Sequence, residues 1–285
     1  MSDRFRVSEA STLLTFLTTK LQGWARNKIK QRLQTGCVQV NGQPIKKHDQ
    51  PLNAGDEIEV TASPKNPLSP TSTSRLEILF SDTDLIAINK PAGLLSVASA
   101  TETRQHALAL LRNQLSRPGR EVKLWPVHRL DRDTSGVLLF ATSREMREAV
   151  NANWDEAEKV YLAIVEGCPD PDRGTINQPL RLDENQYFMH VGAHPEAKHA
   201  LTRYHTERSQ HGRSLLRVEL ETGRQHQIRA HLSWLGHPVI GDPRYGTAGP
   251  RLGLHALKLS CTHPATGRRL SFETKPPADF FSLLG

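Results

Sequence analysis

The stretch VHRLDRDTSG, residues 127–136, gathers reactive side chains directly before the apolar run VLLFA. Asp131 lies between Arg129 and Arg132, with His128 on the same short segment. An arginine close to an aspartate favours the ionised carboxylate. Asp131 is therefore a candidate for a carboxylate that is kept charged beside a substrate. The alternatives are a salt-bridged turn or a solvated loop, in which Asp131 only anchors the backbone.

Ser135 suggests a second chemistry, because serine, histidine and aspartate side chains together can form a hydrolase triad. The surrounding DTSGV lacks the Gly-x-Ser-x-Gly pattern that exposes such a serine. A turn stabilised by side-chain hydrogen bonds and leading into a strand is the better interpretation of residues 134–136.

The 13 histidines suggest metal binding, above all His190, His194 and His199. These residues lack the paired cysteines or the His-Glu-x-x-His helix of common zinc sites. The sequence also contains neither Gly-x-Gly-x-x-Gly nor Gly-Lys-Ser/Thr, the usual phosphate-binding loops. We therefore predict no metal and no nucleotide cofactor.

The segments around these residues resemble strands more often than helices. Because the strands do not alternate strictly with helices, the pattern favours an α+β fold over a doubly wound sheet. The predicted strands are 76–80, 84–90, 136–142, 159–167, 200–207 and 214–222, and the predicted helices are 102–115, 143–158 and 226–236.

A polar segment divides the chain of 285 residues in two. Residues 63–75 contain three prolines among serine, threonine and asparagine, which is typical of a linker. We therefore predict one domain over residues 1–62 and a second over residues 76–285.

The first domain has the signals of two short helices followed by strands. Leucines at helical spacing begin at Leu14, and Asn41-Gly42 between alternating apolar residues predicts a hairpin. The net charge of +7 favours a polyanionic partner, with nucleic acid as the leading candidate. A phosphate-binding surface or an ordinary solvated face would both explain the basic residues here, which are Arg26, Lys28, Lys30, Arg32, Lys46 and Lys47.

The segment GWARNKIKQRLQTGCVQVNGQPIKKHDQPLNAGDEIEV, residues 23–60, resembles the small RNA-binding domain of the ribosomal protein S-four type. Its helix, its VxVNG hairpin and its closing GDxIxV carry the similarity. The resemblance implies a domain that binds structured RNA and performs no chemistry.

The second domain resembles the RluA-type pseudouridine synthases. The block HRLDRDTSGVLLFA contains their signature His-Arg-Leu-Asp-x-x-Thr-Ser-Gly in full. Further blocks follow the family order: INKPAGL upstream, then KVYLAIVEG, ETGRQHQIRAHLSWLGHPVIGDPRYG and the closing RLGLHALKLSCTHPATGRRLSFETKPPADF. The resemblance covers nearly all of residues 76–281 and implies a mixed, mainly antiparallel sheet.

The resemblance also implies roles for individual residues. Asp131 becomes the catalytic nucleophile or base, and Tyr161 stacks on the target uracil and helps to remove its C5 proton. Arg229 becomes the ion-pair partner of Asp131, and Arg129 fills the space that the flipped uridine leaves. We expect three further residues to contact the substrate: His128, Arg132 and Arg224.

Without the resemblance, two of these residues have ordinary explanations. Tyr161 could be a core or cross-strand tyrosine. Arg229 could be a surface residue of a short helix, on which GRQHQIR places Arg224 as well, and either arginine could hold a phosphate.

The implied reaction isomerises uridine to pseudouridine. It breaks a nitrogen–carbon glycosidic bond, rotates the uracil and forms a carbon–carbon bond, with no redox change and no leaving group. Asp131 could attack the base or the sugar covalently, or it could remove a ribose proton to give a glycal. The resemblance favours the glycal, and the sequence leaves these routes open. The target base must first leave its stack. We expect no cofactor.

The expected partner is structured RNA, most of all large-subunit ribosomal RNA, with transfer RNA as an alternative. Two other functions remain open: a noncatalytic RNA-binding or ribosome-assembly factor, and a nucleoside hydrolase. Three widely spaced cysteines and the lack of a long apolar run predict a cytoplasmic protein without a membrane span. We expect it to be a monomer.

Overall fold

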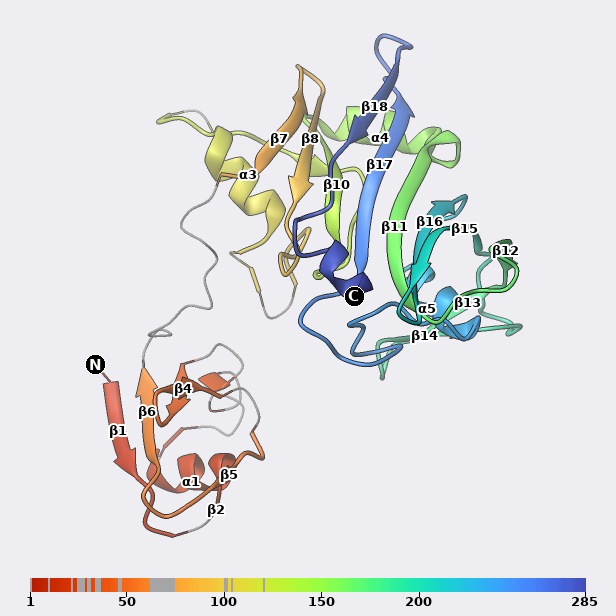
Figure 1. Cartoon of the computed structure of the whole chain (residues 1–285). Helices are drawn as coiled ribbons and strands as arrows, with labels where there is room; N and C mark the ends of the chain where they lie inside the picture. The colour runs from red at the N-terminus through yellow and green to blue at the C-terminus, as the bar shows by residue number, and fades with distance from the viewer. Residues whose placement is uncertain are drawn as a thin grey trace. The chain divides into compact units, whose positions relative to one another are not determined.

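A computed structural model of the chain describes residues 2–9, 11–21, 23–24, 29, 32–33, 37–45, 48–61, 75–99, 102–103, 105–119 and 121–285. The chain divides into two compact units, Met1–Ser74 and Arg75–Gly285 (Figure 1). Of the predicted linker, 63–75, only Arg75 belongs to the described residues.

The first unit contains a small antiparallel sheet and a short helix. The sheet has the order β1 (Ser2–Arg6), β6 (Glu57–Thr61), β3 (Val38–Val40) and β4 (Gln43–Pro44). The hairpin between β3 and β4 turns at Asn41 and Gly42, as the sequence predicts. A two-stranded pair, β2 (Ser11–Thr12) and β5 (Pro51–Leu52), lies beside helix α1 (Leu13–Lys20).

The predicted basic surface of the first unit falls mostly outside the described residues. This applies to Arg26, Lys28, Lys30, Lys46 and Lys47. Arg32 is described: its Nη1 donates to the backbone oxygen of Thr61 at 2.8 Å, and its guanidinium lies 5.6 Å from the centre of the Trp24 ring.

The second unit is built on one large, mainly antiparallel sheet, as the sequence predicts. Within the described part of the chain, its strands follow the order β12, β15, β16, β11, β17, β10, β8 and β7 (Figure 1). Among the described strand pairs of this sheet, only that of β10 with β17 is parallel. The bounds are β7 Glu77–Ser81, β8 Leu85–Lys90, β10 Ser135–Ala141, β11 Glu158–Glu166, β12 Arg173–Asn177, β15 Leu201–Gln210, β16 Arg213–Leu220 and β17 Leu254–Thr262.

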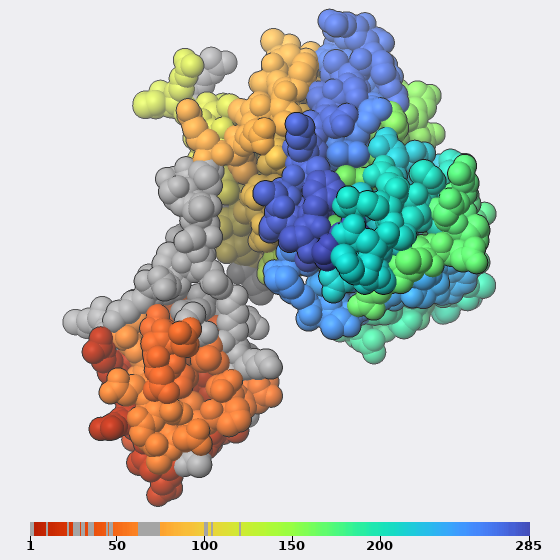
Figure 2. Space-filling model, viewed as in Figure 1, coloured from red at the N-terminus to blue at the C-terminus, as the bar shows by residue number. Residues whose placement is uncertain are grey.

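Shorter elements complete the second unit. Strand β18 (Arg269–Glu273) pairs with β17, and β9 (Trp125–Pro126) pairs with β10. In Figure 2 the blue segment of β17 and β18 lies between the orange segment of β7 and β8 and the teal segment of β15 and β16. A separate hairpin joins β13 (Leu180–Asp183) and β14 (Phe188–Val191), and short 3-10 turns cover Trp154–Glu156 and Phe281–Leu284.

Three helices lie where the sequence predicts helices, but each is shorter. They are α3 (Ala107–Leu115), α4 (Arg144–Ala152) and α5 (Gln227–Trp234). Helix α3 begins late because the Nδ1 atom of His106 caps it, accepting from the backbone N–H of Ala109. Helix α4 ends at Ala152, and β11 already begins at Glu158.

Gly136 allows the close approach of β17 to β10. A Cβ atom at this position would lie 2.2 Å from the backbone oxygen of Ala256, and its φ of +120° disfavours other residues. The prediction of a turn over residues 134–136 is wrong, because Ser135 and Gly136 already belong to β10 and the turn lies at Arg132 and Asp133. The end of the 127–133 loop thus lies against the middle of the sheet.

No described helix is both long enough and apolar enough to cross a bilayer. All three cysteines are free: Cys37 and Cys261 are buried, and Cys168 is exposed.

Candidate active site

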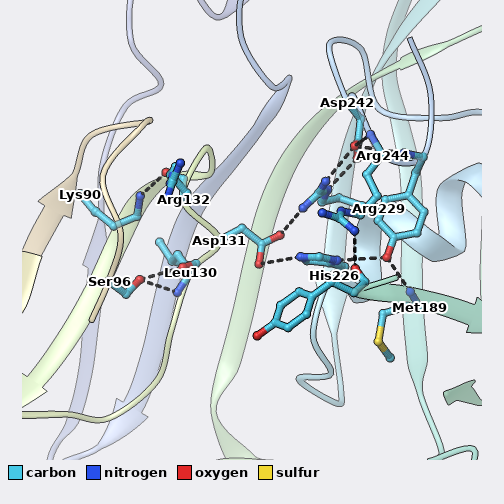
Figure 3. Close-up of polar contacts among 12 residues, drawn as sticks. Lys90, Ser96, Leu130, Asp131, Arg132, Met189, His226, Arg229, Asp242 and Arg244 are labelled. Carbon is cyan, nitrogen blue, oxygen red and sulfur yellow. Dashed lines mark hydrogen bonds and ion pairs between the residues drawn. The ribbon is translucent and has the colours of Figure 1, made fainter. Parts of the chain in front are cut away.

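Two buried side chains from an upstream segment hold the loop that carries Asp131. The hydroxyl of Ser96 donates to the backbone oxygen of Leu130 at 2.7 Å and accepts from its N–H at 3.0 Å. The ammonium group of Lys90 donates to the backbone oxygens of Pro91, Leu94 and Arg132 at 2.7–2.9 Å. Figure 3 shows the bond to Arg132. Both side chains are buried, so the backbone on either side of Asp131 is fixed.

Lys90 is fully buried. Burial lowers the pKa of its ammonium group to about 7, although Asp133 and Asp131 oppose the shift. Its three hydrogens all donate to carbonyl oxygens, so Lys90 acts on the backbone and not on a ligand.

Asp131 meets Arg229 of α5 at the edge of a cavity. Nη1 of Arg229 donates to Oδ2 of Asp131 at 2.9 Å (Figure 3). The Asp131 side chain keeps 25% of its surface exposed, whereas that of Arg229 keeps 9%. No described residue donates a hydrogen bond to the other oxygen, Oδ1. An arginine thus orients the carboxylate and leaves one oxygen free for a substrate.

The opposite side of the Arg229 guanidinium is held by Asp242. Nε and Nη2 donate to its two carboxylate oxygens at 2.6 and 2.8 Å. The Asp242 side chain is fully buried, and its Oδ1 also accepts from the backbone N–H groups of Arg244 and Tyr245. Burial alone would lower the pKa of Arg229, but the two aspartates outweigh burial and raise this pKa above its usual value. The guanidinium is therefore charged.

His226 precedes α5 and lies next to Asp131. Its left-handed backbone, with φ of 49°, directs the ring towards the site. Nε2 lies 3.9 Å from Oδ1 of Asp131, and Nδ1 lies 3.0 Å from the hydroxyl of Tyr245 (Figure 3). Burial lowers the pKa of His226, although Asp131 opposes the shift, so the ring is neutral at neutral pH.

The tautomer of His226 follows from the hydrogen bonds of Tyr245. The phenol oxygen accepts from the backbone N–H of Met189 at 2.9 Å. Only Nδ1 of His226 remains, among the described residues, as an acceptor for the phenol hydrogen. We therefore assign the ring hydrogen to Nε2, the atom that faces Asp131.

A cavity of about 550 Å³ opens over β11 and β17, and Asp131 and Tyr161 both line it. A smaller cavity of about 60 Å³ adjoins it and is lined by the same two residues and by Arg229. Burial raises the pKa of Tyr161, and the charge of Asp131 raises it further. The phenol is therefore protonated at neutral pH.

The remaining candidate residues are not equivalent. Arg129 is exposed and lines both cavities. Arg132 is exposed as well, and its backbone oxygen accepts a hydrogen bond from Lys90. Arg224 lines both cavities, and its Nε donates to the backbone oxygen of His199 at 2.9 Å. The expectation that Arg224 shares a helix with Arg229 is wrong, because α5 begins only at Gln227.

His128 lies in the wall of the large cavity. Its Nε2 accepts from the backbone N–H of Leu139 at 3.2 Å, and its ring stacks on Trp154 with 5.2 Å between ring centres. Burial, assisted by the charge of Lys159, lowers the pKa of His128 to about 4. The ring is therefore neutral and fixed in place.

Ser135 does pair with a histidine, but not as a hydrolase would need. Its hydroxyl lies 2.9 Å from Nδ1 of His255, whose Nε2 lies 3.0 Å from the backbone oxygen of Thr274. Both Ser135 and His255 are buried. A carbonyl takes the place of the triad carboxylate, and no substrate can reach the hydroxyl.

The three histidines considered for a metal site each contact a different residue. His190 lies 3.7 Å from Asp183, His199 bonds Asn177 at 3.1 Å, and Nδ1 of His194 accepts from the N–H of Glu196. Among the residues that the structure describes, no cluster of three or more His, Cys, Asp or Glu side chains could hold a metal ion.

Sequence reasoning did not assign four residues that shape the site: Lys90, His226, Tyr245 and Asp242. All four lie in the segments INKPAGL, GRQHQIR and GDPRYG, which were recognised as blocks. The only available signal was their position in these blocks, because their partners are far away in the sequence.

Comparison with known proteins gives a consistent result. The sequence profile described as RNA pseudouridylate synthase matches residues 84–234. An uncharacterised RNA pseudouridine synthase of Bacillus subtilis is 32% identical over 283 residues, covering 94% of this chain and 91% of that protein. Another, from Mycobacterium tuberculosis, is 34% identical over 278 residues, covering 91% of this chain and 89% of that protein.

Solved structures show the same similarity. Human RNA pseudouridylate synthase domain containing 4 is 25% identical with a TM-score of 0.60, covering 73% of this chain and 91% of that chain. Human RNA pseudouridylate synthase domain containing 1 is 26% identical with a TM-score of 0.61, covering 76% of this chain and 89% of that chain.

Proposed function

This chain belongs to the RNA pseudouridylate synthase family, and from that premise we propose that Asp131 starts the isomerisation of a uridine held in the large cavity. The enzyme is an RNA pseudouridine synthase, and its reaction replaces the bond between N1 and C1′ by a bond between C5 and C1′. The free Oδ1 atom of Asp131, beside an oxygen held by Arg229, carries the proposal.

Two routes would use that oxygen. In one, Oδ1 attacks C1′ as uracil leaves. In the other, it takes the C2′ proton and a glycal forms. Both need an ionised carboxylate of fixed orientation, which the ion pair with Arg229 supports. Deuterium at C2′ separates the routes, since a primary isotope effect is expected only when that carbon–hydrogen bond breaks.

Tyr161 is our candidate for the group that supports the detached uracil and moves its C5 proton. Because the phenol is protonated, it can take the C5 proton only as it releases its own. We propose Asp131 as the acceptor of the phenol proton, since the carboxylate is free again once the new carbon–carbon bond has formed. The electron pair of the broken C5–H bond passes into the ring, and N1 takes a proton from water.

Arg129 is proposed to replace the flipped uridine in its stack. Its side chain is exposed at the mouth of both cavities, as an intercalating guanidinium would need to be. His226 is proposed to steady the free oxygen of Asp131 through its Nε2–H, without adding a charge. We also propose that Arg224 and Arg132 contact the substrate. His128 is proposed to serve the substrate site by supporting the cavity wall.

For the whole chain, we propose an RluA-type enzyme whose first domain, residues 1–62, is an RNA-binding domain of the S-four type. The most specific substrate we propose is large-subunit ribosomal RNA, with transfer RNA as the alternative. The excess of basic residues supports a polyanionic partner. We also propose that the protein is a monomer and lies in the cytoplasm. Its three free cysteines are consistent with a reducing compartment.

The test uses ribosomal RNA, prepared from cells that lack this gene, with tritium at uracil C5. We expect the full-length protein to release tritium into water without releasing uracil. Free uracil would indicate a nucleoside hydrolase, and RNA binding without tritium release would indicate a noncatalytic factor. Mapping pseudouridines in ribosomal and transfer RNA of cells with and without the gene then identifies the substrate.

A further inference from the structure

The large cavity extends well beyond the residues that the isomerisation uses. Its first end, which it shares with the small cavity, includes Asp131, Tyr161 and His226. Its second end is lined by residues absent from the small cavity, among them Arg147 and Lys159. A cavity of about 550 Å³ falls in the range that holds whole small-molecule ligands. There is therefore room for more than a uracil ring.

Lys159 is the most unusual residue of the second end, because only 7% of the residue's surface is exposed and no carboxylate forms an ion pair with it among the described residues. Its ammonium group donates to the backbone oxygen of Trp154 at 3.1 Å and lies 5.6 Å from the centre of that ring. Asp155 and Glu221 act on it only at longer range, and no described residue forms an ion pair with it. Burying an ammonium group is costly unless an anion compensates it.

Arg147 of α4 supplies a second underused cation. Its Nε is buried and has no hydrogen-bond acceptor among the described residues. Its Nη2 lies 3.5 Å from Glu148, but Arg144 holds the same carboxylate at 2.8 Å. One carboxylate thus serves two arginines, so the positive charge of Arg147 is only partly compensated.

The third cation and the aromatic rings at this end already have partners. Lys258 forms an ion pair with Glu158 at 2.9 Å. The ring of Trp154 contacts the His128 ring and the Lys159 ammonium group. The second end therefore offers uncompensated positive charge and not a free aromatic face, which favours an anion over a stacked base.

The position of Lys159 on β11 indicates which kind of anion would bind there. Lys159 and Tyr161 are two residues apart on one strand, so their side chains point to the same face, about 7 Å apart. That separation is of the order of one nucleotide in an extended chain. An anion at Lys159 would therefore neighbour a uracil at Tyr161.

We propose that Lys159 and Arg147 form a phosphate site, which holds the phosphodiester next to the flipped uridine. The inference rests on the proposed function, because it takes Tyr161 as the place of the uracil. The site would hold the displaced strand in its extruded form and prevent the uridine from returning to its stack.

The test uses a stem-loop RNA with a uridine that the full-length wild-type enzyme converts. In four versions, a single uncharged methylphosphonate replaces one of the two nearest phosphates on either side of that uridine. We measure the single-turnover rate at increasing enzyme concentration and obtain from it the half-saturating enzyme concentration. For the wild type, we expect one of the four modified RNAs to raise this half-saturating concentration about tenfold.

The variants Lys159→Met and Arg147→Gln should each raise the half-saturating concentration about tenfold on unmodified RNA. On the one sensitive methylphosphonate RNA they should add almost nothing, since the contact is already lost. Arg147→Lys, which keeps the charge, should retain the sensitivity. If the losses multiply at all four positions, the phosphate site does not exist.

Two variants serve as controls. Lys275→Met and Arg208→Gln remove the same charges from exposed positions outside the cavity, and neither should alter the methylphosphonate pattern. Arg147 lies on a surface helix, so Arg147→Gln remains informative even if Lys159→Met does not fold. Normal turnover by Asp131→Asn would overturn the proposed function, whereas uncoupled losses overturn only the phosphate site.

Discussion

The loop of Asp131 and the loop of Asp242 each present an aspartate to the same guanidinium, yet the two carboxylates differ in every other respect. Asp242 is fully buried, and both of its oxygens accept hydrogen bonds. Asp131 keeps a quarter of its side-chain surface exposed and has one oxygen without a donor among the described residues.

The difference shows how one residue type can serve structure and chemistry within a few ångströms. A buried carboxylate whose two oxygens both accept hydrogen bonds is stable and unreactive, whereas one with a free oxygen at a cavity can act on a ligand. Arg229 links the two, because the buried carboxylate fixes the arginine and the arginine then orients the reactive carboxylate.

The largest expected effect comes from Asp131→Asn. It removes the charge but little of the shape, so turnover should fall by at least about a thousandfold. The free energy of unfolding should change by less than about 1 kcal/mol, since the side chain is partly exposed. Tritium release and urea unfolding measure the two quantities. Appreciable turnover would remove Asp131 from the chemistry.

Asp242→Asn should affect stability more, and turnover less, than Asp131→Asn does. It breaks a buried ion pair and leaves the guanidinium with a single carboxylate, so the free energy of unfolding should fall by about 3 kcal/mol. Turnover, measured at a temperature where the variant is folded, should fall less than in Asp131→Asn. If stability is unchanged, the structural role assigned to Asp242 is wrong.

The pH dependence of stability sharpens the contrast. Burial alone would raise the pKa of Asp242, but Arg229 and two backbone N–H groups outweigh it and hold that pKa below its usual 3.8. A carboxyl whose folded-state pKa is lowered stabilises the protein above the unfolded-state pKa, and this stabilisation is lost as the pH falls through the folded-state value. The stability difference between wild type and Asp242→Asn should therefore shrink below about pH 4. A constant difference in urea unfolding from pH 7 to pH 3 would contradict this.

The smallest expected effect is that of Tyr245→Phe, which acts on Asp131 only through His226. Without the phenol hydroxyl, the tautomer of His226 is no longer fixed, and turnover should fall about tenfold. Tyr204→Phe is the matched control, since that hydroxyl donates to the backbone oxygen of Pro171 away from Asp131. Equal single-turnover rates for the two variants would remove His226 from the mechanism.

Much of the second unit could be predicted from local patterns. The apolar runs 84–90, 136–142 and 159–167 correspond to β8, β10 and β11, since a fully or half-buried strand needs such residues. Weaker segments were not predicted. The first strand, β1, is mixed in polarity and pairs with the distant strand β6. The hairpin of β13 and β14 is local, but its strands are short and also mixed in polarity.

The ends of helices were less predictable than their presence. The pattern that predicted a helix over 226–236 includes His226, but this residue is left-handed, and the helix starts one residue later. Local spacing does not indicate this left-handed conformation, because it occurs together with contacts of the His226 ring to Tyr245 and Asp131, which are distant in the sequence.

The sequence by itself determined which residue types are present and in what order: Asp131 before an apolar strand, Tyr161 within another, and Arg229 in a third block. Only the tertiary structure decided that Arg229 reaches Asp131 across 98 positions of sequence and that Asp242 occupies its other side. The physical reason is that reactivity depends on burial and on which lone pairs remain free. Both are set by contacts between segments that are distant in the chain, which no local pattern encodes.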